Sequence, residues 1–357
     1  MTGLRLIADD LTGALDGAAR LVPVHGPIPT FLSVVPDSSP TSFAIDANTR
    51  DAEADIAHAS ATRLGPMLAT GNPAFRKLDS LLRGHIAIEI DATAKMFQHV
   101  IIAPAFPYQG RITRAGRQYS RTDNADWRDT GVDLAAELSA LGIRATGCVP
   151  GQPVPRGVSL WDAVDDADLD KIVAAGRAAA GSVLWCGSGG LAGALAGRRP
   201  VPLPMLPRPF LVLVGSDQPT TKAQLAVLGP RHRVLNDSAE ANAIAGVLDA
   251  QGGLALTVAL PPALPRLLAA RQINAKFAGL MDEFSRIPFA IGTLMVTGGA
   301  TLRGLVERLG VQRLDVDGEL LPGVPTAILR GGHWEGQRLV AKSGAFGDAG
   351  LLKRLIG

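Results

Sequence analysis

The feature that most constrains this fold is an alternation, along all 357 residues, of short apolar runs with alanine-rich stretches of helical spacing. Apolar runs without polar alternation are typical of strands buried on both faces, as in parallel sheets. Repeated strand–helix alternation predicts α/β architecture with right-handed crossovers. The strand candidates are residues 4–7, 30–35, 42–46, 99–105, 182–186, 210–215, 254–259 and 293–298, and helix candidates include 10–21, 169–180 and 301–310.

A proline-rich segment, GRRPVPLPMLPRP at 197–209, divides the chain. Its prolines disfavour both helix and central strand, so it is interpreted as a stiff, extended linker. We therefore expect two α/β domains with mostly parallel sheets, residues 1–200 and 201–357, each of ordinary domain size. Because open α/β sheets bind ligands beyond the carboxyl ends of their strands, we also expect a ligand cleft between the domains.

Charge and composition exclude several classes of protein. The chain carries 35 Lys+Arg against 33 Asp+Glu, a net charge of +2, which argues against a nucleic-acid partner. No apolar run reaches the roughly 20 residues that cross a bilayer, so no membrane partner is expected. The N-terminus, MTGLRLIADD, lacks a signal-peptide pattern, and Cys148 and Cys186 form no CxxC pair. The sequence predicts a cytoplasmic protein with neither a zinc site nor a disulfide framework, and no set of metal-ligating residues is assigned.

The segment LRLIADDLTGALDG places two adjacent carboxylates, Asp9 and Asp10, between a predicted strand and a predicted helix. Asp10 or Thr12 could cap that helix by accepting a hydrogen bond from a backbone N–H group. Two carboxylates exceed what one cap needs. The surplus indicates a group that binds substrate hydroxyls, a general base or a metal contact.

The segment FRKLDSLLRGH gathers Lys77, Asp79, Ser80 and Arg83 at another expected strand-to-helix turn. Asp79 or Ser80 could cap the following helix, and a surface ion pair between Asp79 and Arg83 is the plainer interpretation. The functional interpretation is that Lys77 and Arg83 clamp a carboxylate, since a guanidinium binds carboxylates in a bidentate manner.

The segment QGRITRAGRQYSRTDNADWR, at 109–128, is rich in arginine. Taken alone, such a stretch is usually a solvated loop. With the charge otherwise balanced, it is the best candidate for a flap that faces an anion, while few aromatic residues interleave the arginines as RNA binding would need. The arginines are Arg111, Arg114, Arg117, Arg121 and Arg128.

Three glycine loops follow predicted strands in the second half of the chain. They contain Gly215–Ser216, Gly298–Gly299 and the segment KSGAFG at 342–347. Each loop can aim free N–H groups at an anion, helped by the helix dipole where a helix follows. Three such loops in one domain favour a nucleotide site.

Several standard motifs are absent, including GxxxxGK[ST], HExxH and GxSxG. WCGSGGLAGAL satisfies GxGxxA through Gly187, Gly189 and Ala192. A dinucleotide site would need an acidic residue about 20 positions later, where the proline-rich segment stands instead. We interpret this turn as close helix–strand packing, with an NAD(P)-dependent oxidoreductase as an alternative.

Taken together, these segments resemble the four-carbon acid sugar kinase family. ADDLTGA combined with KxDSxLRG and KSGxFG is highly specific, and the matching blocks span nearly the whole chain in the family's order. The blocks are ADDLTGA (8–14), DANTR (46–50), KLDSLLRG (77–84), PAFPYQGRITRAG (104–116), LWDAVDDADLDKI (160–172), GSGGLAGAL (187–195), VGSDQPTTKAQL (214–225), VTGGAT (296–301) and AKSGAFGD (341–348).

Members look like two-domain ATP-dependent kinases of threonate, erythronate or 3-oxo-tetronate, with the sugar acid on the N-terminal domain and ATP on the C-terminal domain. The resemblance implies ATP with Mg²⁺ as cofactors, and small molecules as partners; whether the chain forms a homodimer stays open. It assigns Asp10, Arg50, Lys77, Asp79, Ser80 and Arg83 to the sugar-acid side, and Ser216, Gly298, Gly299, Thr301 and Gly344 to the nucleotide side. We add Asp9 and Arg111 to the first set, and Ala300 and Gly347 to the second.

For the mechanism, we expect Asp10, or else Asp79, to orient and deprotonate the attacking hydroxyl. One departure stands out: the family usually carries an acidic residue after the double glycine, where this chain has Ala300. That loss affects a metal, ribose or nucleotide contact, and the chain is also shorter than typical members. A non-catalytic sensor of sugar acid or nucleotide is therefore the second hypothesis.

Overall fold

The computed structural model describes residues 3–33, 40–121, 126–261 and 264–357. The chain divides into two compact units, Met1–Pro202 and Leu203–Gly357. Residues 199–207, within the predicted linker, lie outside helices and strands.

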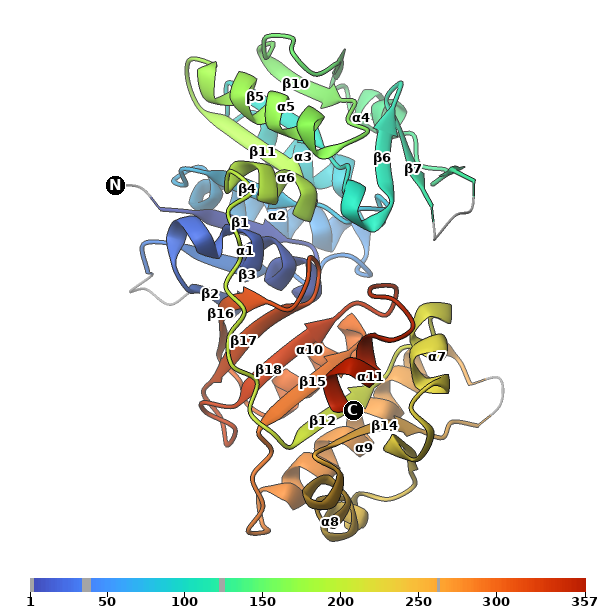
Figure 1. The fold of residues 1–357 in the computed structure, drawn as a ribbon. Helices are drawn as coiled ribbons and strands as arrows, with labels where there is room; N and C mark the ends of the chain where they lie inside the picture. Colours follow the sequence, from blue (N-terminus) through green and yellow to red (C-terminus); the bar gives the residue numbers. More distant parts are fainter. Residues whose placement is uncertain (1–2, 34–39, 122–125, 262–263) are drawn as a thin grey trace. The chain divides into compact units, whose positions relative to one another are not determined.

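The first unit is built on an eight-stranded, all-parallel sheet (Figure 1). Its central strands are apolar and buried, as the unalternating runs of the sequence predict. In spatial order they are β2 (Ile28–Leu32), β3 (Phe43–Asp46), β1 (Arg5–Ala8), β4 (Ala74–Lys77), β11 (Val183–Gly187), β5 (His99–Ala103), β10 (Gly157–Trp161) and β9 (Thr146–Cys148).

Helices cover both faces of this sheet. A hydrophobic cluster joins one face to α2, α3 and α4, while α1, α5 and α6 pack together on the opposite face (Figure 1). The helices are α1 (Leu11–His25), α2 (Ala54–Leu68), α3 (Ile86–Ala94), α4 (Leu134–Ala140), α5 (Asp166–Ala178) and α6 (Gly189–Leu195), with a 3₁₀ turn at Pro107–Gln109.

A small antiparallel sheet projects from the first unit. It contains β6 (Arg111–Arg114), β7 (Arg117–Ser120) and β8 (Arg128–Asp129), so the arginine-rich segment is a strand hairpin rather than a loop. Residues 122–125 of that segment lie outside the described residues.

The second unit has a seven-stranded sheet in which the first five strands in spatial order, ending at β18, are parallel, and β17 runs antiparallel to both β18 and β16. In spatial order the strands are β13 (His232–Leu235), β14 (Gly253–Val258), β12 (Phe210–Val214), β15 (Thr293–Thr297), β18 (Arg338–Lys342), β17 (Pro325–Arg330) and β16 (Arg313–Glu319). The two sheets confirm the predicted α/β architecture with mostly parallel strands.

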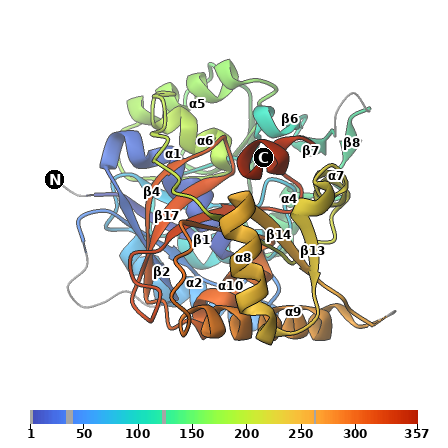
Figure 2. The same cartoon turned by 60° about the horizontal axis from the view of Figure 1, so that its bottom comes forward.

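Apolar side chains of β12, β15 and β18 form a core with the C-terminal helix α11, while α9 and α10 pack against each other (Figure 2). The helices are α7 (Pro219–Ala226), α8 (Ala241–Gln251), α9 (Arg266–Phe284), α10 (Gly299–Arg308) and α11 (Leu351–Ile356), with 3₁₀ turns at Gly229–Arg231 and Ser238–Glu240. In the described part of the chain, no helix has both the length and the apolar character that spanning a bilayer requires.

Candidate functional site

The strand order of the first unit brings its candidate residues to one edge of the sheet. β1 lies between β3 and β4, and Ala8 at its end is in register with Asp46 on one side and Lys77 on the other. The carboxyl ends of parallel strands meet at the same edge. The residues that follow these three strands are therefore neighbours, although they are distant in the sequence.

Arg50 is the centre of this edge. Its guanidinium donates to both carboxylate oxygens of Asp9, at 2.7 and 2.8 Å, and also to Asp10 Oδ2. The backbone N–H groups of Thr49 and Arg50 both donate to the carbonyl of Asp9. The segment after β3 is thus held against the end of β1 by side chains and backbone together.

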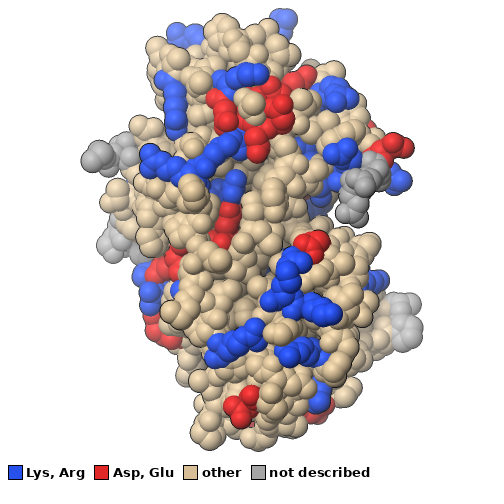
Figure 3. All heavy atoms as spheres, viewed as in Figure 1, with Lys and Arg blue, Asp and Glu red and all other residues tan. Residues whose placement is uncertain are grey.

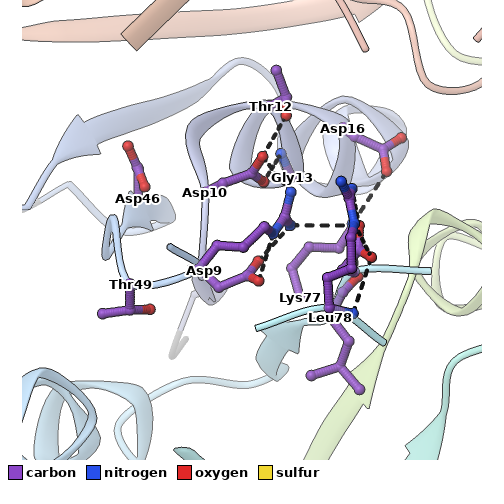
Figure 4. Close-up of polar contacts among 12 residues, drawn as sticks. Asp9, Asp10, Thr12, Gly13, Asp16, Asp46, Thr49, Lys77 and Leu78 are labelled. Atoms are coloured by element: carbon purple, nitrogen blue, oxygen red, sulfur yellow. Dashed lines mark hydrogen bonds and ion pairs between the residues drawn. The ribbon is translucent and has the colours of Figure 1, made fainter. Parts of the chain in front are cut away.

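Asp10 caps α1, which confirms one of the two caps predicted there. Its Oδ1 accepts from the N–H of Gly13 at 2.7 Å, and its Oδ2 accepts from the hydroxyl of Thr12 at 2.7 Å (Figure 4). Asp10 also remains the most exposed carboxylate of the cluster, with 21% of its side chain exposed against 3% for Asp9. Asp10 is therefore the carboxylate most open to a ligand.

The predicted cap at Asp79 or Ser80 is wrong. No helix starts there: α3 begins only at Ile86, and its first residue is preceded by His85, which makes no side-chain cap. Asp79 instead accepts from the N–H groups of Leu81 and Arg83, and so closes a turn. The local pattern resembles a helix start because an aspartate that binds the N–H groups after it serves a turn equally well.

Arg83 forms a two-pronged pair with Asp79, with N···O distances of 2.8 and 2.9 Å, while 56% of its side chain stays exposed. Arg50 Nη2 lies 3.7 Å from the same carboxylate. Burial favours the protonated form of Asp79, but the hydrogen bonds and charges of Arg83 and Arg50 outweigh it and hold its pKa well below the usual range. Asp79 is consequently a weaker base than an ordinary aspartate.

Asp9 behaves in the opposite way. Burial raises the pKa of Asp9 to about 7, against the charge and hydrogen bonds of Arg50. The pKa of Arg50 itself lies well above its normal value, because Asp10 and Asp9 outweigh the burial of the guanidinium. The edge therefore holds two carboxylates with different proton affinities, Asp9 and Asp79, around the guanidinium of Arg50.

Lys77 is buried beneath α1 rather than directed to solvent. Its Nζ lies 3.4 Å from Asp16 Oδ2 and donates to the carbonyl of Leu78 at 3.0 Å (Figure 4). Its stem packs against α1 at Gly17, where a Cβ would lie in ordinary van der Waals contact with it, at 3.4 Å. Lys77 and Arg83, the predicted clamp, thus each have a carboxylate partner within the protein.

Ser80 connects this edge to the antiparallel hairpin, which begins at Arg111. The side chain of Gln118 in β7 donates to the carbonyl of Ser80 at 2.8 Å. Arg111 is buried and donates to the carbonyls of Gln109 and Gly110. Of the other arginines, Arg117 pairs with Asp129 and Asp133, and Arg121 stacks on Trp127.

Sequence reasoning missed a buried charged group behind the edge. Glu89 of α3 accepts from the hydroxyl of Thr49 at 2.6 Å and from Arg76 of β4 at 3.1 Å. Glu89 thereby fixes the residue next to Arg50. The sequence does show a single glutamate inside the apolar run IAIEI. Because a buried glutamate almost always has a partner, this residue could have been expected to form a buried contact.

The nucleotide-side candidates also converge. β12, β15 and β18 are adjacent parallel strands, so the three glycine loops leave the sheet side by side. A Cβ on Gly215 would lie 1.9 Å from Thr301 Oγ1, and a Cβ on Gly344 would lie 1.9 Å from Ser216 Oγ. The loops touch so closely that only glycine fits at these two positions.

The start of α10 and the 342–347 loop complete this cluster. Gly298 precedes α10 with a φ of 107°, followed by Gly299, Ala300 and Thr301 in the first turn, whose N–H groups have no partner within the helix. Gly347 has a φ of 84°. The structure thus brings together Ser216, Gly298, Gly299, Ala300, Thr301, Gly344 and Gly347, with N–H groups rather than charged side chains as donors.

The glycine turn at Gly187 serves packing. A Cβ on Gly190 would lie 2.5 Å from the carbonyl of Ala105, and one on Gly189 would lie 2.8 Å from Phe106. Every residue of α6 is buried. This backbone has no room for a dinucleotide.

Two family models match the chain: "Sugar-binding N-terminal domain" at residues 4–139 and "Nucleotide-binding C-terminal domain" at residues 211–352. A D-threonate kinase from Cupriavidus necator is 30% identical, over 97% of this chain and 95% of the relative. The chain belongs to the four-carbon acid sugar kinase family.

Other members of the four-carbon acid sugar kinase family are similar over the same length. A 3-oxo-tetronate kinase from Pseudomonas fluorescens is 25% identical, over 99% of this chain and 96% of the relative. Two solved structures share the fold: one from Salmonella typhimurium LT2 (TM-score 0.76, 21% identity, 99% of each chain) and Haemophilus influenzae protein HI1011 (TM-score 0.68, 21% identity, 98% of each chain).

Proposed function

We propose that the chain transfers the γ-phosphoryl group of ATP to a terminal hydroxyl of a four-carbon sugar acid of the threonate, erythronate or 3-oxo-tetronate type. The observation that carries the proposal is the convergence of three glycine loops at the carboxyl edge of β12, β15 and β18, in a member of this kinase family. Phosphoryl transfer needs positioning and charge neutralisation more than covalent chemistry. A backbone-lined phosphate site suits that requirement.

On the sugar-acid side, Arg83 would bind the substrate carboxylate. Its side chain is held at one end by Asp79 and exposed over more than half of its surface, so it can accept a second carboxylate. Arg50 and Lys77 would add positive charge behind it.

Asp10 would orient the attacking hydroxyl and accept its proton. It is the most exposed carboxylate of the cluster, and its position is fixed by the cap of α1. Asp79, the second candidate, has a pKa too low for an effective base.

On the nucleotide side, the N–H groups of the first turn of α10 and of the 343–347 loop would bind phosphate oxygens, with Ser216 as a further donor. Within the described residues, no group of three or more His, Cys, Asp or Glu is arranged to hold a metal. This fits Mg²⁺ held mainly by the phosphates of ATP with one carboxylate. Asp217, exposed in the loop after β12, would supply that carboxylate, and the ion would neutralise phosphate charge.

We also place the protein in the cytoplasm, where ATP is available. Its two cysteines, Cys148 and Cys186, are both buried free thiols, which suits a reducing compartment. Figure 3 shows acidic as well as basic side chains on the face drawn, which suits small-molecule partners better than a nucleic acid.

The test is an ADP-release screen of the purified chain with Mg²⁺, ATP and each four-carbon sugar acid, including the 3-oxo forms. We expect ADP release that depends on one or a few of these acids. Thermal stabilisation by an acid without any ADP release would contradict the kinase and favour a sensor, for which the neutral Ala300 in the α10 turn is the specific observation.

A further inference from the structure

Lys342, at the end of β18, is completely buried, and nothing in the mechanism above uses it. Among the described residues, no carboxylate lies within ion-pair distance of its ammonium. Its Nζ donates instead to the carbonyls of Ser343, at 3.0 Å, and Phe346, at 3.1 Å. A buried ammonium without a counter-charge is costly, so its place at a ligand-binding edge calls for a functional reason.

The two carbonyls that Lys342 binds determine where the next N–H groups point. In a trans peptide the C=O of one residue and the N–H of the following residue point in opposite directions. Because the carbonyls of Ser343 and Phe346 face the ammonium, the N–H groups of Gly344 and Gly347 face away from it.

A third peptide of the loop is oriented by α7. The hydroxyl of Thr221 donates to the carbonyl of Gly344 at 2.8 Å, so the N–H of Ala345 faces away from that helix. In the part of the chain that the structure describes, the N–H groups of Gly344, Ala345 and Gly347 have no acceptor. Backbone N–H groups left free by a turn are a typical anion site.

We propose that Lys342 is a positioning residue of the nucleotide site: its ammonium holds the 343–347 loop so that the N–H groups of Gly344, Ala345 and Gly347 bind a phosphate group of the nucleotide. The proposal rests on the nucleotide-binding part of the proposed function. The bound phosphate supplies the negative charge that the protein does not provide near Lys342. The loop therefore matches a polyphosphate better than a neutral ligand.

The proton uptake of Lys342 on ADP binding can be measured, and a lysine with a purely structural role would not cause such uptake. Burial lowers the pKa of Lys342 to about 7, so at pH 8 most molecules carry Lys342 as a neutral amine. The acceptors of Nζ are carbonyls, and its strand neighbour in register on β15 is Thr297. From α7, Thr221 and Gln224 bind the same loop, with Gln224 donating to the carbonyl of Phe346 at 3.1 Å, and none of these three side chains titrates. Phosphate binding favours the ammonium, so the wild-type chain takes up a proton when ADP binds at pH 8.

The experiment is calorimetric titration of the full chain with ADP and Mg²⁺ at pH 8, in two buffers of different ionisation enthalpy. We compare wild type with Lys342→Met and with Lys353→Met, which removes an exposed lysine of the same unit. Lys342→Met should raise the Kd for ADP by about 10–100-fold, the factor expected for charge-assisted hydrogen bonds, and abolish proton uptake. Lys353→Met should change neither, and D-threonate binding should stay unchanged in both.

An unchanged Kd for ADP in a folded Lys342→Met variant, or no proton uptake by wild type, overturns this proposal alone. If Lys342→Met does not fold, Thr221→Val tests the same loop with a nearly isosteric change and should weaken ADP binding; unchanged binding there overturns the proposal. If the wild-type chain binds ADP but phosphorylates no sugar acid, the proposed kinase activity is contradicted, and the role of Lys342 is judged on ADP binding alone. If the wild-type chain binds no ADP, both the proposed function and the proposed role of Lys342 are contradicted.

Discussion

Lys77 and Lys342 stand at corresponding places in the two units, each at the end of a parallel strand, and each donates to the carbonyl of the next residue. Their surroundings differ. Lys77 has Asp16 at 3.4 Å and lies beside a group of carboxylates and guanidiniums, whereas the ammonium of Lys342 faces carbonyl oxygens. One edge holds its charges in internal pairs, and the other presents mainly backbone N–H groups.

This difference indicates how each edge would select its ligand. In a charge pair such as Arg83–Asp79, the aspartate holds the guanidinium in a fixed orientation, in which it can bind a ligand carboxylate. The hydroxyl groups of the same ligand can donate to the carboxylates nearby. A backbone site is less sensitive to the identity of the ligand but depends on the loop conformation, because each N–H group is placed by its peptide plane. Ligand binding at the first edge should therefore be sensitive to changes in side-chain charge, and ligand binding at the second edge to added side-chain volume.

The largest effect is expected from Asp10→Asn. The asparagine oxygen still caps α1, so the fold is kept while the proton acceptor is lost. If Asp10 accepts the hydroxyl proton, kcat should fall by about 10²–10⁴-fold in the ADP-release assay. The matched control is Asp165→Asn, the same change at the cap of α5, where the aspartate accepts from the N–H of Asp168. A nearly normal kcat in Asp10→Asn would show that another group accepts the hydroxyl proton.

Arg83→Ala tests charge on the same edge. Loss of the exposed guanidinium should raise KM for the sugar acid by about 10–100-fold, the factor expected for hydrogen bonds to a charged group, with the KM for ATP unchanged. Arg198→Ala, which breaks surface pairs with Asp166 and Asp170, is the control and should alter neither KM. Equal losses for both substrates in Arg83→Ala would indicate a folding role.

Gly215→Ala tests volume on the other edge. The new Cβ would lie 1.9 Å from Thr301 Oγ1, so the loops must separate, at a cost of about 1–3 kcal/mol in the free energy of unfolding. The KM for ATP should rise while the KM for the sugar acid is kept. Gly246→Ala in α8, where a Cβ meets nothing within 4 Å, should instead stabilise by about 0.5–1 kcal/mol. Equal stability of the two variants would refute the close contact.

The smallest effects are slopes of stability with pH, and they have opposite signs in the two units. Asp9, with its pKa raised to about 7 by burial, destabilises the fold above pH 7, and this cost disappears as the pH falls from 7 towards 4. Lys342, with its pKa lowered to about 7, destabilises the fold below pH 7, and this cost disappears as the pH rises from 7 towards 10.

Each slope can reach at most about 1.4 kcal/mol per pH unit, the value for one proton. Urea unfolding at pH 5, 7 and 9.5 checks them. Asp9→Asn should flatten the acidic side of the profile, and Lys342→Met the alkaline side. Profiles that keep the wild-type shape in both variants would show that neither group titrates as proposed.

The sequence predicted the central strands of both sheets well, because residues such as 210–215 and 293–298 are continuous apolar runs. It did not reveal the antiparallel strands β16 and β17, whose mixed polar and apolar residues resemble surface segments. The helix cap predicted at Asp79 or Ser80 does not exist, since the same kind of hydrogen bonds, accepted by Asp79, close a turn.

By itself, the sequence determined the α/β class, the positions of the glycine loops and a cap of α1 at Asp10 or Thr12, because apolar periodicity and turn chemistry act over a few residues. Only the tertiary structure decided that Arg50 binds Asp9 and Asp10, some 40 positions away, and that Glu89 supports Thr49. Those contacts depend on β1 lying between β3 and β4. Strand order follows from the packing of the whole sheet, so no local pattern encodes it.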